Sequence, residues 1–181
     1  MALTVLAWVR EGRTQTVEVP VRLQAELLSK VVAYDRNYAQ RAHSRALVLV
    51  LVKGGDAESA RVGEQIKSEL GVLDALGGLP HAEELVRYST PANVAELVKS
   101  RGAAVLFVSV GLADEMPALA RALDDVSVLS VAAASSYVER GAVLGFDAES
   151  GRPKLVVNLE RARRQKVAFK PEVLKLARVV S

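Results

Sequence analysis

Two kinds of apolar run alternate along the chain, and each predicts a different element. In residues 20–35 the apolar side chains recur at i, i+4, i+5, i+8 and i+9 from Leu23, with charged side chains on the opposite side. This pattern predicts a helix that begins at Pro20 and packs on a core. Residues 46–52 are instead apolar without interruption and are followed by two glycines. Such a run is typical of a strand covered on both faces, as in a parallel sheet under helices.

Strands and helices keep alternating through most of the sequence. Further helices are expected in residues 56–71, 91–102 and 112–125, and further strands in residues 84–89, 103–111 and 126–133. Alternation of this kind implies βαβ units and an α/β layered fold. We therefore expect residues 20–181 to form a single layered domain with a mostly parallel sheet and flanking helices.

The C-terminal part of the chain departs from this alternation. Two apolar strands, in residues 142–147 and 153–159, follow each other around a short loop with Gly151 in a turn position. They predict an antiparallel hairpin that joins the otherwise parallel sheet. The chain then ends in a predicted short helix, residues 171–180, whose buried side chains are expected to be Val173, Leu174, Leu176 and Ala177.

The start of the chain allows two interpretations. Residues 2–9 are apolar, no basic residue precedes them, and Arg10 follows directly. A signal peptide needs a basic start, an apolar segment and a small-residue cleavage site. Residues 1–19 are therefore either a short N-terminal strand or the remnant of an export signal, and both readings stay open. No later stretch approaches the length of an unbroken apolar transmembrane helix, so no transmembrane segment is predicted.

Charge is distributed unevenly between the body and the end of the chain. The net charge is +3, yet residues 151–181 carry nine Lys or Arg against two Asp or Glu, whereas residues 1–150 carry 15 against 19. A basic end on a mildly acidic body makes anions, nucleic acid or a negatively charged partner worth considering. The chain has no cysteine, which excludes disulfides, thiol nucleophiles and cysteine–metal sites.

The basic residues of the C-terminal part concentrate in residues 159–166. In a helix, Arg161, Arg163 and Arg164 point in different directions around the axis, whereas a helix that reads DNA gathers its basic side chains on one side. Binding of single strands needs aromatic platforms, and Phe169 is the one aromatic residue after residue 150. We therefore expect a short amphipathic helix with a solvated basic surface rather than a nucleic-acid site. The three arginines remain candidates for contact with an acidic protein partner or anionic lipid.

Small polar residues follow several of the predicted strands. The turn at residues 53–59 lacks the glycine, lysine and hydroxyl pattern of a phosphate loop. Ser109 lies at a strand end, but Phe107 stands where a nucleophile elbow needs glycine. Because open α/β sheets bind ligands at such strand ends, a ligand crevice is a further hypothesis. Its candidate residues are Ser109, Gly111, Ser130, Ser135 and Ser136.

No group of residues with the pattern of a catalytic or metal site emerges from the sequence. His43 and His81 lack a second histidine or a carboxylate at metal-ligand spacing, so we expect both on the surface. The acidic pairs 83–84 and 124–125 are expected to be solvated at helix ends. We therefore predict a protein that is not an enzyme and needs no metal or other cofactor.

The part of the chain after residue 128 combines a strand at 129–131, an apolar-x-Phe strand, a hairpin into an apolar strand that ends in Asn, and a final Leu- and Ala-containing segment. The motif positions are Tyr137, Gly141, Phe146, Asn158, Ala162, Leu174 and Ala177, and an amphipathic helix begins at Val21. With these features the chain resembles the YfiR family of bacterial periplasmic proteins over roughly Val21 to Ser181, most clearly after Leu129. The chain departs from the family where Ala142 replaces the second glycine of a pair, and it lacks the family's Trp-Pro and cysteines, which puts redox sensing in doubt.

The resemblance implies a small α/β domain similar to one lobe of a periplasmic binding protein, often dimeric. The best-known members repress a membrane-bound diguanylate cyclase by binding its periplasmic sensor region. We therefore expect a non-enzymatic periplasmic regulator whose partner is the periplasmic region of an inner-membrane signalling protein in a cyclic-di-GMP pathway. The alternative is a periplasmic domain that binds a small molecule or a cell-envelope fragment. The motif residues are expected to be structural, with Asn158 satisfying backbone groups and Gly141 allowing a special turn.

Overall fold

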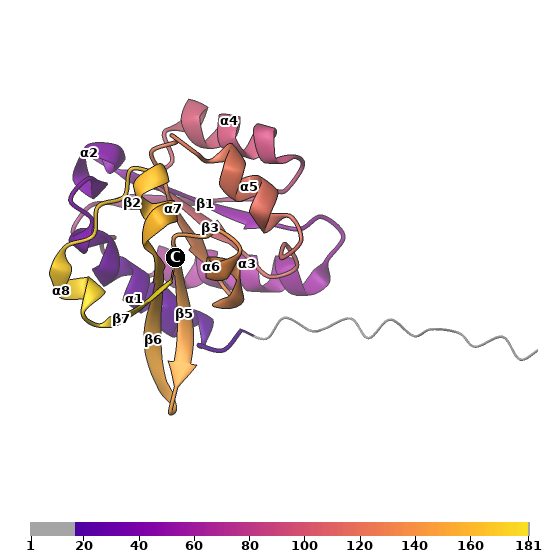
Figure 1. Ribbon diagram of the computed structural model, residues 1–181. Coiled ribbons are helices and arrows are strands. Elements are labelled where there is room, and N and C mark those ends of the chain that lie inside the picture. Colours follow the sequence, from indigo (N-terminus) through magenta and orange to yellow (C-terminus); the bar gives the residue numbers. More distant parts are fainter. Residues whose placement is uncertain (1–16, 181) are drawn as a thin grey trace, which may run out of the picture.

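One seven-stranded sheet forms the centre of the fold (Figure 1). The computed structural model describes residues 17–180. The strands are β1 (Ala46–Val52), β2 (His81–Arg87), β3 (Val105–Val108), β4 (Leu129–Ala132), β5 (Leu144–Glu149), β6 (Arg152–Asn158) and β7 (Ala177–Val180). Their order is β2-β1-β3-β4-β5-β6-β7. Strands β1 to β5 are parallel, whereas β6 is antiparallel to β5 and β7 is parallel to β6. The predicted parallel sheet with a C-terminal antiparallel hairpin is therefore confirmed.

Helices cover both faces of this sheet (Figure 1). They are α1 (Val21–Val31), α2 (Tyr38–Ala42), α3 (Ala57–Gly71), α4 (Pro91–Arg101), α5 (Met116–Ala122), α6 (Ser136–Glu139), α7 (Leu159–Arg164) and α8 (Pro171–Leu174), with a 3-10 turn at Val32–Tyr34. Side chains of α1 and α3 pack on one face of the sheet, and those of α4, α5 and α6 pack on the other. Alternate residues of β1 enter the two apolar clusters, which explains its uninterrupted apolar run.

The helices that follow β1 and β2 begin at capping residues that the sequence supplies. Asp56 accepts a hydrogen bond from the Ser59 N–H (2.9 Å) at the start of α3. Thr90 accepts one from the Asn93 N–H (3.2 Å), with Pro91 opening α4. Each cap satisfies a backbone N–H that has no partner inside the helix. The turns at the carboxyl ends of β1 and β2 are fixed in this way.

The start of the described chain is anchored at the carboxyl end of β4. The Gln24 side chain donates to the carbonyls of Val19 (2.9 Å) and Ala133 (3.0 Å), which ties the first turn of α1 to the sheet. The N-terminal strand or export-signal remnant predicted in residues 1–19 lies outside the described residues up to residue 16, and residues 17–19 form no strand. No described helix is long and apolar enough to cross a membrane.

The end of the chain differs from the prediction. Helix α8 stops at Leu174, and residues 177–180 form strand β7 along β6, so the helix predicted through residue 180 is wrong in its second half. Leu176, which that helix would bury, is 67% exposed. Val179 and Val180 are β-branched and suit a strand, and pairing with β6 satisfies part of the backbone that a helix would otherwise satisfy internally.

Candidate functional site

The order of the sheet creates a topological switch point between the carboxyl ends of β1 and β3, which we call the crossing point. It is lined by polar groups. These neighbouring strands continue into α3 on one face and α5 on the other, and ligands of open α/β sheets bind where the chain diverges in this way. Lys53 follows β1, and its ammonium group donates to the Gly111 carbonyl (2.9 Å) and pairs with Glu115 (3.1 Å). The other carboxylate oxygen of Glu115 is buried without a hydrogen-bond partner among the described residues. Charged groups from two strand ends therefore meet here.

Two tyrosines flank this crossing point. Burial, followed by the Glu115 carboxylate, raises the pKa of Tyr88, which comes directly after β2. Tyr137 of α6 is fully buried, and its hydroxyl accepts a hydrogen bond from the Leu112 N–H (2.9 Å). Burial raises the pKa of Tyr137 to about 12, although the Leu112 N–H opposes that shift. Tyr137 is therefore neutral at physiological pH and holds the loop after β3 in place.

Gly111 forms the close contact between the two loops. Its φ is +87°, and a Cβ atom there would lie 2.6 Å from an Asp56 carboxylate oxygen. A larger residue would therefore be strained in its backbone and would also displace the N-terminal cap of α3. Of the predicted crevice residues, Gly111 is the one that lies at the crossing point.

The four serines predicted to line the crevice do not converge on it. Ser109 and Ser130 are buried, and their hydroxyls are engaged with the Ser59 carbonyl (2.7 Å) and the Val143 N–H (3.0 Å), respectively. Ser130 lies in the first half of β4, away from the carboxyl edge. Ser135 donates to Glu18 (2.6 Å), and Ser136 is exposed at the start of α6. A ligand-binding role for these residues stays a prediction.

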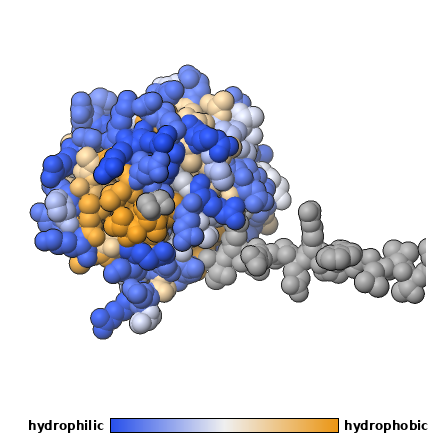
Figure 2. Space-filling model, in the orientation of Figure 1, coloured by the Kyte–Doolittle hydropathy of each residue, from blue (hydrophilic) through white to orange (hydrophobic). Residues whose placement is uncertain are grey.

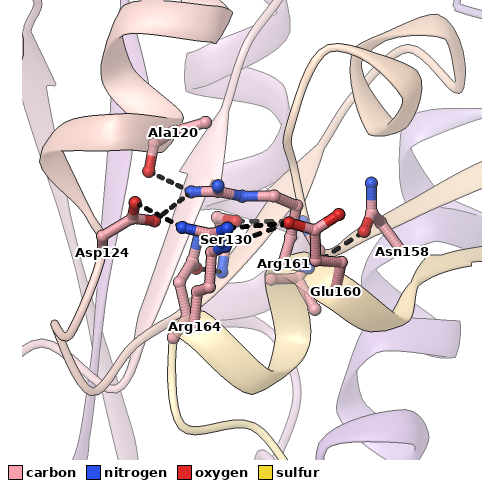
Figure 3. A network of polar contacts seen from close by, with 9 residues as sticks. Ala120, Asp124, Ser130, Asn158, Glu160, Arg161 and Arg164 are labelled. Atoms are coloured by element: carbon pink, nitrogen blue, oxygen red, sulfur yellow. Dashed lines mark hydrogen bonds and ion pairs between the residues drawn. The ribbon is translucent and has the colours of Figure 1, made fainter. Parts of the chain in front are cut away.

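The arginines of α7 take part in a polar network with the end of α5 (Figure 3). Arg161 donates to Asp124 (2.6 Å) and to the Ala120 carbonyl, and its side chain is only 13% exposed. Arg164 pairs with the other Asp124 oxygen (3.2 Å) and with Glu160 (2.9 Å). The expectation that Asp124 is simply solvated is therefore wrong, because it links two helices.

Arg163 differs from its two neighbours. It is exposed and makes no ion pair with another residue in the described part of the chain. Among the three predicted contact residues, Arg163 alone therefore presents its charge fully to solvent, whereas the charges of Arg161 and Arg164 are matched by carboxylates.

Asn158 and Gly141 hold this region together. Asn158 accepts from the Arg161 N–H (2.9 Å) at the start of α7 and donates to the Val138 carbonyl (3.2 Å). Gly141 has a φ of +115°, and a Cβ atom there would lie 2.4 Å from that of Ala120. Phe146 lies in the core, and Leu174 and Ala177 pack against it partly buried. These motif residues thus pack the hairpin, α5 and α7 together.

His81 and Glu83 form a pair, although both were expected to be solvated surface residues. His81 is the first residue of β2, and its side chain is only 5% exposed, hydrogen-bonded to Glu83 and to the Leu73 carbonyl (3.0 Å). Residues i and i+2 of a strand share a face, which brings the two side chains together. Glu84 pairs with Arg101. Glu83 and Glu84 both belong to β2, so the expectation that they lie at a helix end is wrong. No cluster of three potential metal ligands occurs within residues 17–180.

Two of the exposed apolar side chains lie at the last strand. Four large apolar side chains are exposed in the described part of the chain: Tyr34, Val72, Leu176 and Val179. Leu176 and Val179 belong to β7 and the turn before it, and Lys170, just before α8, lies over the Tyr34 ring (5.9 Å). Figure 2 shows an apolar area beside the C-terminal end of the chain. We call Leu176, Val179 and the open edge of β7 the β7 surface.

Comparisons with known proteins agree with this architecture. The sequence model of the YfiR/HmsC-like family matches residues 22–178. No curated protein sequence matches the chain significantly. One solved structure with a similar fold is the ABC domain from Streptococcus pneumonia in complex with L-Trp. Its TM-score is 0.65 at 15% identity, and the match covers 89% of this chain and 62% of that one.

Two further structures share the fold. A substrate-binding protein with adhesive properties from Clostridium difficile, in its ligand-free open form, has a TM-score of 0.61 at 16% identity and covers 94% of this chain and 66% of its own. A conserved domain protein from Vibrio cholerae O1 biovar El Tor has a TM-score of 0.59 at 17% identity, with 90% and 60% covered. The chain spans less than two thirds of each relative, and at these identities the likeness shows the fold alone.

Proposed function

Because the chain belongs to the YfiR/HmsC-like family, we propose that it is a non-enzymatic periplasmic regulator that binds the periplasmic region of an inner-membrane signalling protein. A membrane-bound diguanylate cyclase, and hence cyclic-di-GMP signalling, is the specific partner class that the family favours. The observation that carries the proposal is the β7 surface, which exposes apolar side chains on an open strand edge.

The β7 surface has the properties of a protein-binding site. Leu176 is 67% exposed and Val179 is 46% exposed, and they lie close together in the sequence beside a strand edge. Neighbouring exposed apolar side chains are more informative than single ones. Since β7 is the last strand of the sheet formed by residues 17–180, one row of its backbone groups has no neighbouring strand among them. A partner can cover the side chains and pair with the edge at the same time.

Charges next to the β7 surface give the partner a preferred sign. Lys170 and Lys175 flank α8 and are exposed, whereas Arg178 on β7 is paired with Asp147 (2.7 Å). An acidic rim on the partner would complement these exposed lysines and orient the encounter. A role in partner binding for Arg163 is compatible with this arrangement, whereas Arg161 and Arg164 are already matched within the chain.

The test compares two exposed apolar positions. Leu176→Asp changes the β7 surface, and Val72→Asp makes the same chemical change at a position that is 74% exposed beyond the end of α3. Tagged wild-type and variant proteins are crosslinked in the native host, and captured proteins are identified by mass spectrometry. We expect wild type and Val72→Asp to capture the same inner-membrane signalling protein and Leu176→Asp to lose it. Equal capture by Leu176→Asp would refute the role of the β7 surface, and failure of wild type to capture any such protein would refute the regulator.

The crossing point between β1 and β3 supports a second candidate function, the binding of a small molecule or cell-envelope fragment. The specific observation is the buried, unpartnered Glu115 oxygen beside the Lys53 ammonium group. A ligand with both a donor and an acceptor would satisfy this pair. In a thermal-shift screen, a ligand at 100 times its Kd would add about 2.7 kcal/mol of stability, and Glu115→Gln should reduce that gain. A screen without stabilising compounds would argue against this function.

A further inference from the structure

A cavity of about 540 Å³ opens at the amino ends of β3 and β4. The crossing point lies at the other, carboxyl ends of the strands. Segments distant in the sequence form the cavity walls: α2, the end of α4, the turn before β4 and the turn after α7. A volume of this size is typical of small-molecule sites. Neither the β7 surface nor the Lys53–Glu115 pair contributes to it.

The cavity has a positive lining. Lys99 and Lys166 line it together with Arg41, which is paired with Asp35, and none of the described Asp or Glu side chains lines it. The body of the chain up to residue 150 is acidic overall, so this composition is opposite to that of its surroundings. Val98 and Val126 provide an apolar portion of the wall. A ligand that suits the cavity is therefore negatively charged and carries an apolar part.

Arg41 is the buried polar group of the cavity wall. Its side chain is only 3% exposed, and Nη2 pairs with Asp35, but Nε and Nη1 have no hydrogen-bond partner among the described residues. Asp35 also accepts from the backbone N–H groups of Asn37 (3.1 Å) and Ala168 (2.8 Å). Because Asp35 serves three donors, it is poorly placed to satisfy the remaining Arg41 N–H groups. Buried donors of this kind call for an acceptor.

The backbone at two exposed residues of the cavity wall is also unusual. His43 and Lys166 have φ values of 53° and 56°, in the region that residues other than glycine seldom adopt. Asn37 donates to the Lys166 carbonyl (2.8 Å) and so ties the turn after α7 to the start of α2. Contacts between distant segments therefore hold Lys166 at the cavity wall.

We propose that this cavity binds a small organic anion with at least two phosphate or carboxylate groups, held by Lys99 and Lys166 beside the buried guanidinium of Arg41. The apolar wall would receive the ligand's uncharged part. This site is independent of the proposed function, because it lies at a different edge of the sheet from both surfaces argued above.

The simpler explanation for Lys99 is that it complements the dipole of α4, since it lies in the last turn of that helix. Lys30 provides the matched control: it is also exposed and lies in the last turn of another 11-residue helix, α1, but does not line the cavity. The test variant is Lys99→Gln with Lys166→Asn, because Asn tolerates a positive φ. The control variant is Lys30→Gln.

Isothermal titration of the full chain at low salt uses inorganic pyrophosphate, citrate and ADP as probes. Each carries at least two phosphate or carboxylate groups, and together they separate phosphate from carboxylate and simple from organic anions. We expect at least one probe to bind, the double variant to raise its Kd by about tenfold or more, and Lys30→Gln to change it by less than about twofold. The side-chain Nε–H resonance of Arg41 should move when that probe is added. Failure of all three probes at millimolar concentration, or equal binding to the double variant and the control, would overturn the proposal.

Discussion

Two regions of the C-terminal part of the chain, α7 and β7, use their side chains in opposite ways. In α7 one charged group turns inward: Arg161 is 13% exposed and lies against Asp124 and the Ala120 carbonyl (Figure 3). In β7 and the turn before it, two apolar side chains turn outward: Leu176 and Val179 are 67% and 46% exposed. The charged region therefore holds the fold together, and the apolar region is available to a partner.

The physical reason for the inward arginine lies in the last turn of α5. The Asp124 N–H donates to the Arg121 carbonyl (3.1 Å) rather than to Ala120, so the Ala120 carbonyl is free to accept from Arg161. A cation at the end of a helix is favoured both by these carbonyls and by the helix dipole. Asp124 supplies the compensating charge, which makes a partly buried guanidinium tolerable.

The largest expected effect tests the close packing beneath α7. Gly141→Ala places a methyl group 2.4 Å from the Ala120 Cβ at a φ of +115°, so we expect the free energy of unfolding to fall by about 3 kcal/mol. Urea denaturation followed by circular dichroism measures the change. Gly151→Ala is the control, since Gly151 also has a positive φ but has open space around it, and about 1 kcal/mol is expected there. Equal losses in the two variants would mean that packing against Ala120 is unimportant.

The next effect separates Arg161 from Arg163. Arg161→Met leaves Asp124 and the Ala120 carbonyl without their buried donor, and the free energy of unfolding should fall by about 2 kcal/mol. Arg163→Met removes the same charge from an exposed position and should change it by less than about 0.5 kcal/mol. The same denaturation measurement compares both variants. Similar stabilities would contradict the view that α7 is held through Arg161.

A smaller effect is expected at the N-cap of α7. Asn158→Ala removes the acceptor for the Arg161 N–H and the donor to the Val138 carbonyl, and about 1 kcal/mol of stability should be lost. Asn158→Asp keeps the acceptor but not the donor. Its stability should therefore lie between those of wild type and Asn158→Ala, and a loss as large as that of alanine would show that the Val138 contact dominates.

The same comparison explains how far the sequence predicts the molecule. Local patterns were sufficient for β1 and the β5–β6 hairpin, because uninterrupted apolar runs and turn residues are read within about ten positions. They failed at residues 175–180, where Pro171 signals a helix start but the following valines pair with β6, about 20 residues earlier in the sequence. Pairing with a distant strand overrides a weak local preference.

The candidate sites show the same limit. Gly141 and Asn158 stand out as motif positions, but the partner of Arg161 lies 37 residues away on another helix, and no local pattern connects them. The Lys53–Glu115 pair depends on the order of the strands, and the positive cavity gathers four separate segments. The residue types are visible in the sequence, whereas their meeting is a property of the topology.

The smallest expected effect concerns the β7 surface and completes the comparison. Leu176→Asp should change the free energy of unfolding by less than about 0.5 kcal/mol, because a side chain that is 67% exposed gives up little contact. Denaturation of this variant beside Val72→Asp, which is exposed to a similar degree, measures the difference. A loss of several kcal/mol in Leu176→Asp alone would mean that Leu176 is packed, as in the buried helix that the sequence predicts. If stability is unchanged while capture of the signalling protein is lost, Leu176 acts in binding and not in folding, which is the opposite of the result expected for Arg161.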